Sequence, residues 1–481
     1  MKYVLAIDIG ASSGRHILGC LKDGKMEIKE VHRFENNAVK KGKYLVWQVD
    51  YLFGEIKAGI KKCNDMGIYP ESVAFDTWGV DYVLLDENGD MIGDAISYRD
   101  LRTEGMMEEV FGSIPKEKIY SKTGIQFMIL NTIFQLAAQI KEDRSILDKA
   151  DTLLTMPDFL GYLLSGAKYN EYTEASTSQL LNAKARDWDR ELIAELGVNP
   201  DIFLKMTEPG TVVGEVKPEI SGKPMKLIAV GSHDTASAVA AVPAQEQDFL
   251  YISSGTWALM GTEAQEPSLD AATMEKNFTN EGGVYGTIRL LKNITGMWII
   301  QQVRAAQGKK TGYGEYAAMA AKETPFKSII NPDDICFYSP DNMVDEIKKF
   351  CERTDQPVPE TQGEIARCVF DSMALAYKKT LSDLEDICGK DLGEIHIIGG
   401  GCQNLLVNKI TADVTGKKVV AGPIEATAIG NIMVQLISLG DIADIGEGRR
   451  IVGESFDAIE YVPGEMTEEI KAAYEKFLTF I

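Results

Sequence analysis

The pattern of strands at the amino end recurs near the middle of the chain, and this recurrence restricts the possible folds more than any other feature. Tyr3 to Asp8, Gly14 to Leu21 and Met26 to Phe34 read as three successive strands separated by short turns. A second series starts with Ile252-Ser-Ser-Gly-Thr-Trp, which echoes Ile7-Asp-Ile-Gly-Ala-Ser-Ser. Such self-similarity is typical of a duplicated domain. We therefore predict two domains of related architecture.

Alternating helices and strands near the carboxyl end indicate an α/β fold. Helical and strand patterns alternate from Glu364 to Leu439, as expected of a sheet covered by helices. Further upstream, an Ala-rich helix at Thr235 to Val242 is followed by the polar stretch Ala244 to Asp248. Because that stretch divides the 481 residues into nearly equal halves, we predict domains at residues 1–245 and 246–481.

The charge balance excludes several classes of partner. The chain has 50 Lys and Arg against 72 Asp and Glu, a formal net charge of -22 at pH 7. Such a surface repels phosphate backbones and anionic lipid, so we expect neither nucleic acid nor a membrane as partner. The amino end is too acidic for a signal peptide, and no apolar run approaches the ~18 residues of a membrane span. We expect a cytoplasmic protein with small-molecule partners, and the sequence leaves its oligomeric state open.

The cysteines and histidines do not predict a metal centre. The seven Cys and four His show none of the spacings of zinc or iron–sulfur sites. Small buried hydrophobic side chains in a reducing compartment explain most of the Cys. Pairing of Cys351 with Cys368 stays open.

Phosphate binding cannot rest on a P-loop, because the chain has no G-x-x-x-x-G-K-[ST] motif. The alternatives are two hairpin tips of small residues, Asp8 to Arg15 and Ser253 to Thr256, whose N–H groups can face an anion. Gly and Ser also simply form good turns. Asp8 ends an apolar strand, where it suits either a Mg²⁺ contact or a cap of the turn. Gly399 to Gly401 link a strand to a helix, as a nucleotide-binding loop or a plain tight turn would.

Asp234 is the candidate catalytic base. It follows a buried strand and opens a helix in the sequence Ser232-His-Asp. A carboxylate at that position commonly caps the helix. In a cleft, the same carboxylate would take the proton of a sugar hydroxyl during phosphoryl transfer.

Two further segments combine aromatic rings with carboxylates. Asp76-Thr-Trp-Gly-Val-Asp81 offers Trp78 and Asp81 as the floor of a sugar site, although a solvated turn with a core Trp would look the same. Ser97-Tyr-Arg-Asp100 is equally ambiguous, because Arg99 and Asp100 can pair with each other.

Taken together, these segments resemble the FGGY family of carbohydrate kinases. The likeness runs from Met1 to about Leu439, and the ordered set is more specific than any single motif. The matching stretches are Ile7-Asp-Ile-Gly-Ala-Ser-Ser-Gly-Arg15, Thr77-Trp-Gly-Val-Asp81, Ser97-Tyr-Arg-Asp100, Gly231-Ser-His-Asp-Thr235, Ser253-Ser-Gly-Thr-Trp257, Leu291-Lys-Asn-Ile294, Gly296-Met-Trp298 and Ile398-Gly-Gly-Gly-Cys-Gln-Asn404.

The resemblance implies a fold and a reaction. The fold would be α/β, with two actin-like, RNase-H-like domains of the superfamily of sugar kinases, hsp70 and actin around a central cleft. The reaction would be phosphorylation of the 1-hydroxyl of L-rhamnulose by ATP with Mg²⁺. Residues 1–245 would then bind the sugar and supply the first phosphate loop, and residues 246–481 would bind the nucleotide.

The resemblance also assigns roles to single residues. Asp234 would be the base and, with Asp8, a metal contact, while Gly79 and His233 would contact the ketose. The residues facing ATP would be Ala11, Ser12, Ser13, Gly14, Arg15, Thr256, Asn293, Gln301, Gly399 and Gly400.

Other functions stay open at this point. FGGY kinases of fuculose, xylulose or glycerol share the scaffold, so the sugar is less secure than the reaction. An actin-like ATPase without a sugar substrate, or a scaffold that has lost activity, is also compatible with the fold. Both leave Asp234 and Asp81 without a task. The segment Gly440 to Ile481 has no predicted role.

Overall fold

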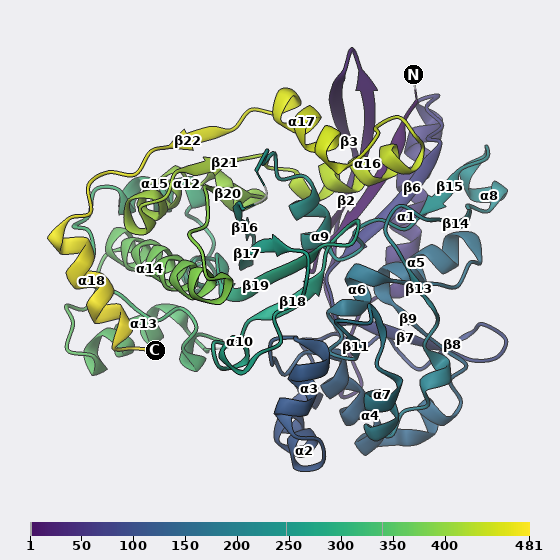
Figure 1. The fold of residues 1–481 in the computed structure, drawn as a ribbon, viewed down its shortest axis with the longest axis horizontal. Helices are drawn as coiled ribbons and strands as arrows, with labels where there is room; N and C mark the ends of the chain where they lie inside the picture. Colours follow the sequence, from purple (N-terminus) through teal and green to yellow (C-terminus); the bar gives the residue numbers. More distant parts are fainter. Residues whose placement is uncertain (1, 247, 339) are drawn as a thin grey trace. The chain divides into compact units, whose positions relative to one another are not determined.

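A computed structural model describes residues 2–246, 248–338 and 340–481, so Gln247 of the predicted boundary segment lies outside the described residues. The chain folds into two compact units, each assembled from separate segments (Figure 1). The first unit contains Met1–Gln245, Glu263–Leu290 and Ala426–Ser455. The second unit contains Glu246–Thr262, Leu291–Glu425 and Phe456–Ile481. Sheets covered by helices confirm the predicted α/β class.

The main sheet of the first unit has the strand order β14-β15-β6-β1-β2-β3. Its centre is β1 (Val4–Ile9), which pairs antiparallel with β2 (Ser13–Lys22) and parallel with β6 (Ser72–Thr77). On the far sides lie β3 (Lys25–Glu35), β15 (Lys226–Ile228) and the antiparallel β14 (Val212–Glu215). The predicted first hairpin and its third strand are therefore confirmed.

The main sheet of the second unit repeats this arrangement. Its central strand, β16 (Leu250–Ser254), pairs antiparallel with β17 (Trp257–Ala264) and parallel with β20 (Ile395–Ile398). This sheet has seven strands, and β18 (Thr279–Gly282) lies at its edge beside β19. The other six, in the order β19-β17-β16-β20-β21-β22, match the first sheet strand by strand, with an antiparallel last strand in both. The remaining strands are β19 (Ile288–Thr295), β21 (Val419–Ala421) and β22 (Ile459–Tyr461). The recurrence seen in the sequence is thus a recurrence of topology.

Helices cover both faces of the first sheet, which explains why β1 is apolar along its length. Leu5, Ile7 and Ile9 share a core with residues of α1 (Val49–Asp65). The opposite face contacts α16 (Ala426–Ser438). A strand buried on both faces reads as a continuous apolar run rather than an alternating one.

Helix α16 is attached to the first sheet by polar side chains as well as by packing. Gln435 accepts a hydrogen bond from the Ser72 hydroxyl at 2.6 Å and donates one to the Leu5 carbonyl at 3.1 Å. Gly430 lets the backbones of α16 and α9 (Asp234–Ala240) touch, since a Cβ there would overlap the Ser237 carbonyl. Helix α9 is therefore held against a helix from a distant part of the sequence.

The other elements of the first unit include helices that the sequence patterns left unassigned between residues 100 and 220. Its remaining helices are η1 (Leu101–Thr103), α2 (Met106–Ser113), α3 (Lys116–Thr123), α4 (Thr132–Asp148), α5 (Met156–Ser165), α6 (Tyr172–Ser176), α7 (Arg190–Glu195), η2 (Pro200–Ile202), α8 (Pro218–Ser221), α10 (Ala271–Glu275) and α17 (Ile445–Ser455). Its remaining strands are β4 (Val39–Lys41), β5 (Tyr44–Val46), β7 (Tyr82–Leu85), β8 (Met91–Ile92), β9 (Thr152–Thr155), β10 (Asn170–Glu171), β11 (Leu181–Asn182), β12 (Asp187–Trp188), β13 (Met206–Thr207) and β18 (Thr279–Gly282).

In the second unit the helices are longer on average and fewer. They are α11 (Trp298–Ala306), α12 (Tyr313–Ala320), η3 (Ile335–Phe337), α13 (Met343–Arg353), α14 (Gln362–Cys388), η4 (Gly400–Gln403), α15 (Leu405–Thr415) and α18 (Glu468–Leu478). Cys351 and Cys368, whose pairing was open, are free thiols that hydrogen-bond to each other. Among the helices of the described ranges, none has the length and apolar character needed to cross a bilayer.

Candidate functional site

The predicted phosphate loop of the first unit is the tip of the β1–β2 hairpin. The N–H of Gly10 donates to the Ser13 carbonyl at 2.9 Å, which closes the turn. Asn36 fixes the tip from the side, because its side-chain amide donates to the Gly10 carbonyl at 2.8 Å. Ser12 is exposed, and Ala11 and Ser13 are half-buried. The small residues at the tip therefore combine a fixed backbone with access from solvent.

Gly14 has a packing role of its own. It belongs to β2, where a Cβ would overlap the ring of Phe34 on the neighbouring strand β3. The adjacent Arg15 turns its guanidinium to Asp8, with 3.0 Å between Nη2 and the carboxylate oxygen Oδ2. The predicted metal contact and the predicted phosphate contact are thus ion-paired with each other.

Asp76 joins this group from the neighbouring strand, since the parallel register sets it directly beside Asp8. Its Oδ2 accepts a hydrogen bond from Asn431 of α16 at 2.6 Å. Burial raises the pKa of Asp76 well above its usual value, and the charges of Asp8 and Asp234 raise it further. Carboxylates from β1, β6 and the start of α9 therefore gather within electrostatic reach of one another.

Gly79 lies in a strained connection between β6 and β7. Val80 has φ 69°, which is a genuine outlier for a β-branched residue and points to a functional or structural constraint. The Val80 N–H donates to the Thr177 hydroxyl at 2.9 Å, and its carbonyl accepts from the Thr132 hydroxyl at 2.6 Å. A Cβ on Gly79 would lie 3.0 Å from the Thr177 methyl group. Thr177 thus holds the backbone around Gly79 in place.

Trp78 and Asp81, the predicted sugar floor, are both buried. The Asp81 carboxylate accepts from the indole N–H groups of Trp47 at 2.6 Å and of Trp78 at 2.9 Å. It also accepts from the Tyr98 N–H at 3.1 Å and the Gln135 amide at 3.0 Å. The four donors account for both carboxylate oxygens without a ligand.

Asp234 is the first residue of α9, and the N-cap position belongs to His233, which makes no side-chain cap hydrogen bond. The Asp234 carboxylate accepts from the Thr235 hydroxyl at 3.0 Å and lies 3.6 Å from His233 Nε2. Its side chain is 36% exposed. The helix-capping role considered from the sequence is therefore not the one that the structure gives Asp234.

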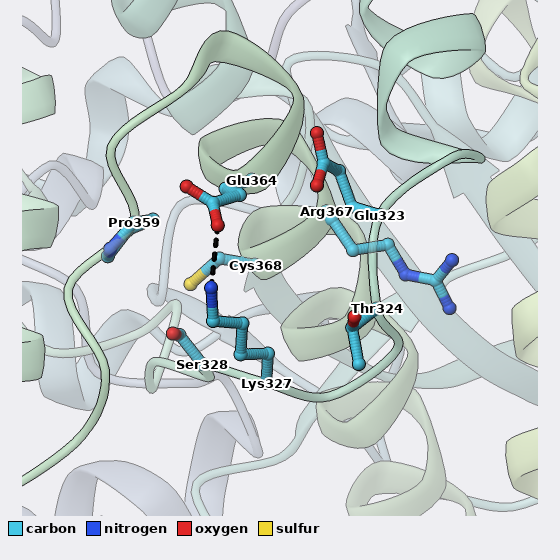
Figure 2. Close-up of a pocket in the computed structure, with 8 residues that line it drawn as sticks. All are labelled: Glu323, Thr324, Lys327, Ser328, Pro359, Glu364, Arg367 and Cys368. Carbon is cyan, nitrogen blue, oxygen red and sulfur yellow. Dashed lines mark hydrogen bonds and ion pairs between the residues drawn. The ribbon is translucent and has the colours of Figure 1, made fainter.

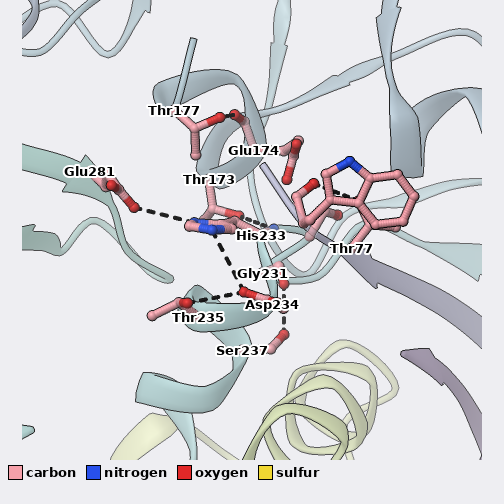
Figure 3. Close-up of polar contacts among 12 residues, drawn as sticks. Thr77, Thr173, Glu174, Thr177, Gly231, His233, Asp234, Thr235, Ser237 and Glu281 are labelled. Carbon is pink, nitrogen blue, oxygen red and sulfur yellow. Dashed lines mark hydrogen bonds and ion pairs between the residues drawn. The ribbon is translucent and has the colours of Figure 1, made fainter. Parts of the chain in front are cut away.

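His233 is held by two residues that the sequence patterns did not single out. Its Nδ1 lies 3.1 Å from Nη2 of Arg289. The same nitrogen lies 3.2 Å from Oε2 of Glu281 (Figure 3). Arg289 is fully buried and pairs with Glu281 at 3.1 Å. The imidazole is therefore fixed between a buried cation and a buried anion, with its other nitrogen toward Asp234.

The short helix α6 lines the same part of the first unit and was also missed from the sequence. Glu171 caps it, and its carboxylate accepts from the N–H groups of Thr173, Glu174 and Ser232. The Thr173 hydroxyl in turn accepts from the His233 N–H at 3.2 Å. Burial raises the pKa of Glu171 to about 8. Through these bonds α6 is fastened to the segment that carries Asp234.

The predicted nucleotide-binding residues lie in the second unit. The β16–β17 hairpin turns at Gly255 and Thr256, and the N–H of Trp298 donates to the Thr256 carbonyl at 3.0 Å. The N–H of Met297 donates to the Gly255 carbonyl at 3.2 Å. The hairpin tip is therefore tied to the start of α11. Gln301 lies half-buried on that helix.

The glycine loop after β20 lies against the same hairpin. Gly399 has φ 81°, and a Cβ on Gly401 would overlap the Ser254 hydroxyl. Gly400 differs from both, since a Cβ there would meet no atom within 4 Å. The structure therefore brings Thr256, Gly399 and Gly400 together. Asn293 is half-buried in β19, the strand beside β17.

The carboxylates of the first unit can be compared with the ligands that a metal ion requires. Within the described ranges, no three or more His, Cys, Asp or Glu side chains are grouped so as to hold a metal. Mg²⁺ usually binds through one or two carboxylates together with phosphates and water, and Asp8 and Asp234 are hard oxygen ligands of that kind. Their shared neighbour Asp76 has one buried carboxylate oxygen without a hydrogen-bond partner among the described residues. The donor set fits Mg²⁺.

A separate small pocket lies in the second unit at the start of α14 (Figure 2). Lys327 and Glu364 pair across it at 2.6 Å, and Arg367 pairs with Asp371 at 2.8 Å. None of the predicted site residues lines this pocket.

Two family models match the chain. The N-terminal domain of the FGGY family of carbohydrate kinases matches residues 3–241, and the C-terminal domain of that family matches residues 250–439.

Curated relatives named rhamnulokinase match over nearly the whole chain. The protein from Oceanobacillus iheyensis is 46% identical over 95% of this chain and 97% of its own. The protein from Halalkalibacterium halodurans is 46% identical over 97% of this chain and 100% of its own. The protein from Bacillus subtilis is 43% identical over 96% of this chain and 95% of its own.

Solved structures show the same fold at low sequence identity. Xylulose kinase from Lactobacillus acidophilus has a TM-score of 0.82 at 15% identity, covering 100% of this chain and 97% of that chain. Glycerol kinase from Plasmodium falciparum with ADP has a TM-score of 0.80 at 15% identity, covering 100% and 97%. At this identity the likeness establishes the fold alone.

Proposed function

Because the chain belongs to the FGGY family of carbohydrate kinases, we propose that it transfers the γ-phosphate of ATP to the 1-hydroxyl of L-rhamnulose, giving L-rhamnulose 1-phosphate. The supporting comparison is the identity of 43–46% to proteins named rhamnulokinase over at least 95% of this chain. The supporting observation in the molecule is that the carboxylates around α9 differ in burial and in hydrogen bonding. These differences favour one of them as the base.

Asp234 is the carboxylate best suited to accept a proton. Asp81 accepts four protein hydrogen bonds, and Asp76 is fully buried. Asp100 is occupied by the N–H groups of Leu45 and Arg102. Asp234 alone among these combines a partly exposed side chain with a position at the first residue of α9. It takes the proton of the 1-hydroxyl as that oxygen attacks the γ-phosphate.

The ketose contacts follow from the backbone around Gly79 and from His233. Thr177 and Thr132 hold the strained connection at Val80, which leaves the Gly79 peptide fixed for hydrogen bonding to a hydroxyl. Glu281 and Arg289 fix the His233 ring in one orientation. We assign Trp78 and Asp81 the task of supporting this backbone as well as bordering the sugar.

The residues for ATP are those predicted from the sequence. Ala11, Ser12, Ser13, Gly14 and Arg15 of the first hairpin act on the phosphates, together with Thr256 of the second. Asn293, Gln301, Gly399 and Gly400 act on the rest of the nucleotide. Asp8 and Asp234 would hold Mg²⁺, which supplies positive charge to the phosphate oxygens as transfer proceeds.

The organisation and location of the protein are part of the proposal. Residues 1–245 are the sugar-binding domain and residues 246–481 the nucleotide-binding domain. With a net charge of -22, the protein works in the cytoplasm on small molecules and binds neither nucleic acid nor a membrane.

A ketose panel tests the proposal. ADP release is measured with L-rhamnulose, L-fuculose, D-xylulose, L-ribulose and glycerol, and without any sugar. We expect turnover to depend on sugar and kcat/KM to be highest for L-rhamnulose. A preference of about tenfold for xylulose or glycerol, equivalent to roughly 1.4 kcal/mol, would contradict the proposed substrate. Sugar-independent ADP release would contradict the kinase reaction itself.

A further inference from the structure

Glu174 of α6 carries a buried carboxyl group that has no hydrogen-bond partner among the described residues. Its side chain is 1% exposed. Neither carboxyl oxygen has a hydrogen-bond partner anywhere in residues 2–246, 248–338 and 340–481. Burying a polar group without a hydrogen bond is unfavourable, so native proteins rarely leave one in this state. The carboxylate of the neighbouring Glu171, by contrast, accepts several hydrogen bonds.

The surroundings of Glu174 are those of the proposed ketose site. Among the charged groups, Asp158 and Glu171 act most strongly on its carboxyl, followed by Asp234 and Asp81. The Thr177 hydroxyl, which fixes the Val80 N–H, donates to the backbone carbonyl of Glu174 at 2.8 Å. In Figure 3, Glu174 lies with Thr173 and Thr177 on one side of His233, and Asp234 lies on the other. The helix that carries the unpartnered carboxyl is therefore anchored to the residues around Gly79 and His233.

The chemistry of the group suits a sugar hydroxyl. Burial, followed by the charges of nearby carboxylates, raises the pKa of Glu174 well above its usual value and favours the uncharged form. An uncharged carboxyl donates through its O–H and accepts through its carbonyl oxygen. A hydroxyl likewise offers one donor and two acceptor positions. If Glu174 were an ionised carboxylate, its charge would repel the phosphates. The uncharged carboxylic acid does not.

We infer that the carboxyl of Glu174 hydrogen-bonds a hydroxyl of the bound ketose and helps to select which ketose is phosphorylated. This assignment rests on the proposed function. It adds a ketose-binding residue from α6 to Gly79 and His233, and it explains why the protein keeps a fully buried acidic group without an internal partner.

The experiment compares three substitutions with the wild type. Glu174→Ala removes the group, Glu174→Gln keeps a neutral donor and acceptor of the same size, and Asp158→Asn is the matched control. Asp158 is also a fully buried carboxyl with an unpartnered oxygen, and its pKa is raised to about 7 by burial, but its other oxygen accepts from the Thr155 hydroxyl of β9 and the Glu171 N–H of β10. Ketose KM, ATP KM, and ketose affinity by calorimetry without ATP are measured for each.

We expect Glu174→Ala to raise the ketose KM and dissociation constant by about tenfold, equivalent to about 1.4 kcal/mol, with the ATP KM within about twofold. Glu174→Gln should recover at least part of that loss. The ratio of kcat/KM for L-rhamnulose to that for L-fuculose should change in Glu174→Ala. Asp158→Asn should leave the ketose affinity within about twofold.

Each other outcome is decisive. A folded Glu174→Ala protein with wild-type ketose affinity would overturn the inference while leaving the kinase function intact. If Glu174→Ala fails to fold, Glu174→Asp replaces it, since it withdraws the carboxyl by one methylene group. Unchanged ketose affinity in that variant would overturn the inference as well. A wild type that neither binds nor phosphorylates any ketose of the panel would overturn both proposals together.

Discussion

The two main sheets share one topology but end in different chemistry. In each, a central strand forms a hairpin on one side and a parallel pair on the other. In the first unit, β6 runs into Thr77 to Asp81, beside the segment of His233 and Asp234. In the second, β20 runs into Gly399 to Gly401. The same position in a repeated sheet thus carries buried carboxylates and a histidine in one unit and bare backbone in the other.

This difference separates two tasks. Carboxylates and a fixed imidazole accept protons and read hydroxyl groups, whereas glycine backbone approaches a flat or anionic ligand closely. We expect substitutions beside β6 and α9 of the first unit to change kcat or the ketose KM, and substitutions in the glycine loop to change the ATP KM. A glycine-loop substitution that changed the ketose KM, or a substitution beside α9 that changed only the ATP KM, would contradict this division.

The largest effect is expected for Asp234→Asn. Asn has nearly the same size, and the N-cap position of α9 belongs to His233, so no cap is lost. Asn does not accept a proton from the attacking hydroxyl, and kcat should fall by about 10² to 10⁴-fold. Both KM values and a thermal melt are measured on the same preparation. Near wild-type kcat would remove Asp234 from the role of base and weaken the division between the units.

The next effect concerns the glycine loop. Gly400→Val places its side chain where no protein atom lies within 4 Å of the new Cβ, so the fold should persist. Its branched side chain would obstruct a nucleotide, and we expect the ATP KM to rise about tenfold with little change for the ketose. Gly401→Val is the matched control, because its Cβ would overlap Ser254 and should lower the melting temperature instead. An unchanged ATP KM in Gly400→Val would make the loop a plain turn.

Thr177→Val tests the support of the strained connection. The substitution is nearly isosteric but removes the acceptor of the Val80 N–H and the donor to the Glu174 carbonyl. Loss of a buried hydrogen bond of about 1 kcal/mol should raise the ketose KM by about fivefold and leave the ATP KM unaffected. An equal rise in both KM values would mean that the connection serves the whole protein rather than the sugar.

The last prediction concerns the stability of the first unit rather than its kinetics. Burial raises the pKa of Asp158 to about 7, whereas in the unfolded chain it lies near 3.9. Between these values the folded state holds a proton that the unfolded state has released, so stability falls as pH rises, by at most about 1.4 kcal/mol per pH unit. Asp158→Asn removes this proton. Urea unfolding at pH 5, 6 and 7 should therefore show a shallower decline than in the wild type, and equal slopes would contradict the shift.

The repeated strands were predictable from the sequence because they depend on local patterns of neighbouring residues. The runs around Ile7 and Ile252 are apolar, end in Gly and Ser, and lie at the centres of the two sheets. The long helix α14 begins with Thr361 and Glu364, which form a capping box, and ends at Gly389 in a left-handed conformation. Such signals need only neighbouring residues.

The supporting residues of the site could not be predicted, because their environment is set by distant segments. Glu174, Glu281 and Arg289 look like ordinary surface residues in the sequence, and α6 is too short to show helical periodicity. Gly14 was predicted for a phosphate loop, yet its requirement for Gly comes from Phe34 on another strand. The one local sign near Glu281 is the Gly-Gly that follows it, and a Cβ on Gly282 would overlap the ring of Tyr172.

The attachment of α16 to the first sheet also bears on how the protein is synthesised. Asn431 and Gln435 complete the hydrogen bonds of Asp76, Ser72 and the Leu5 carbonyl, but they are translated long after the strands that they cover. A nascent chain that has reached residue 245 carries those strands with one face still exposed to water and a buried-type carboxyl without its partner. The first unit is therefore finished only when almost the entire polypeptide has left the ribosome, and exposed sheet in the interval is a target for chaperones or for aggregation.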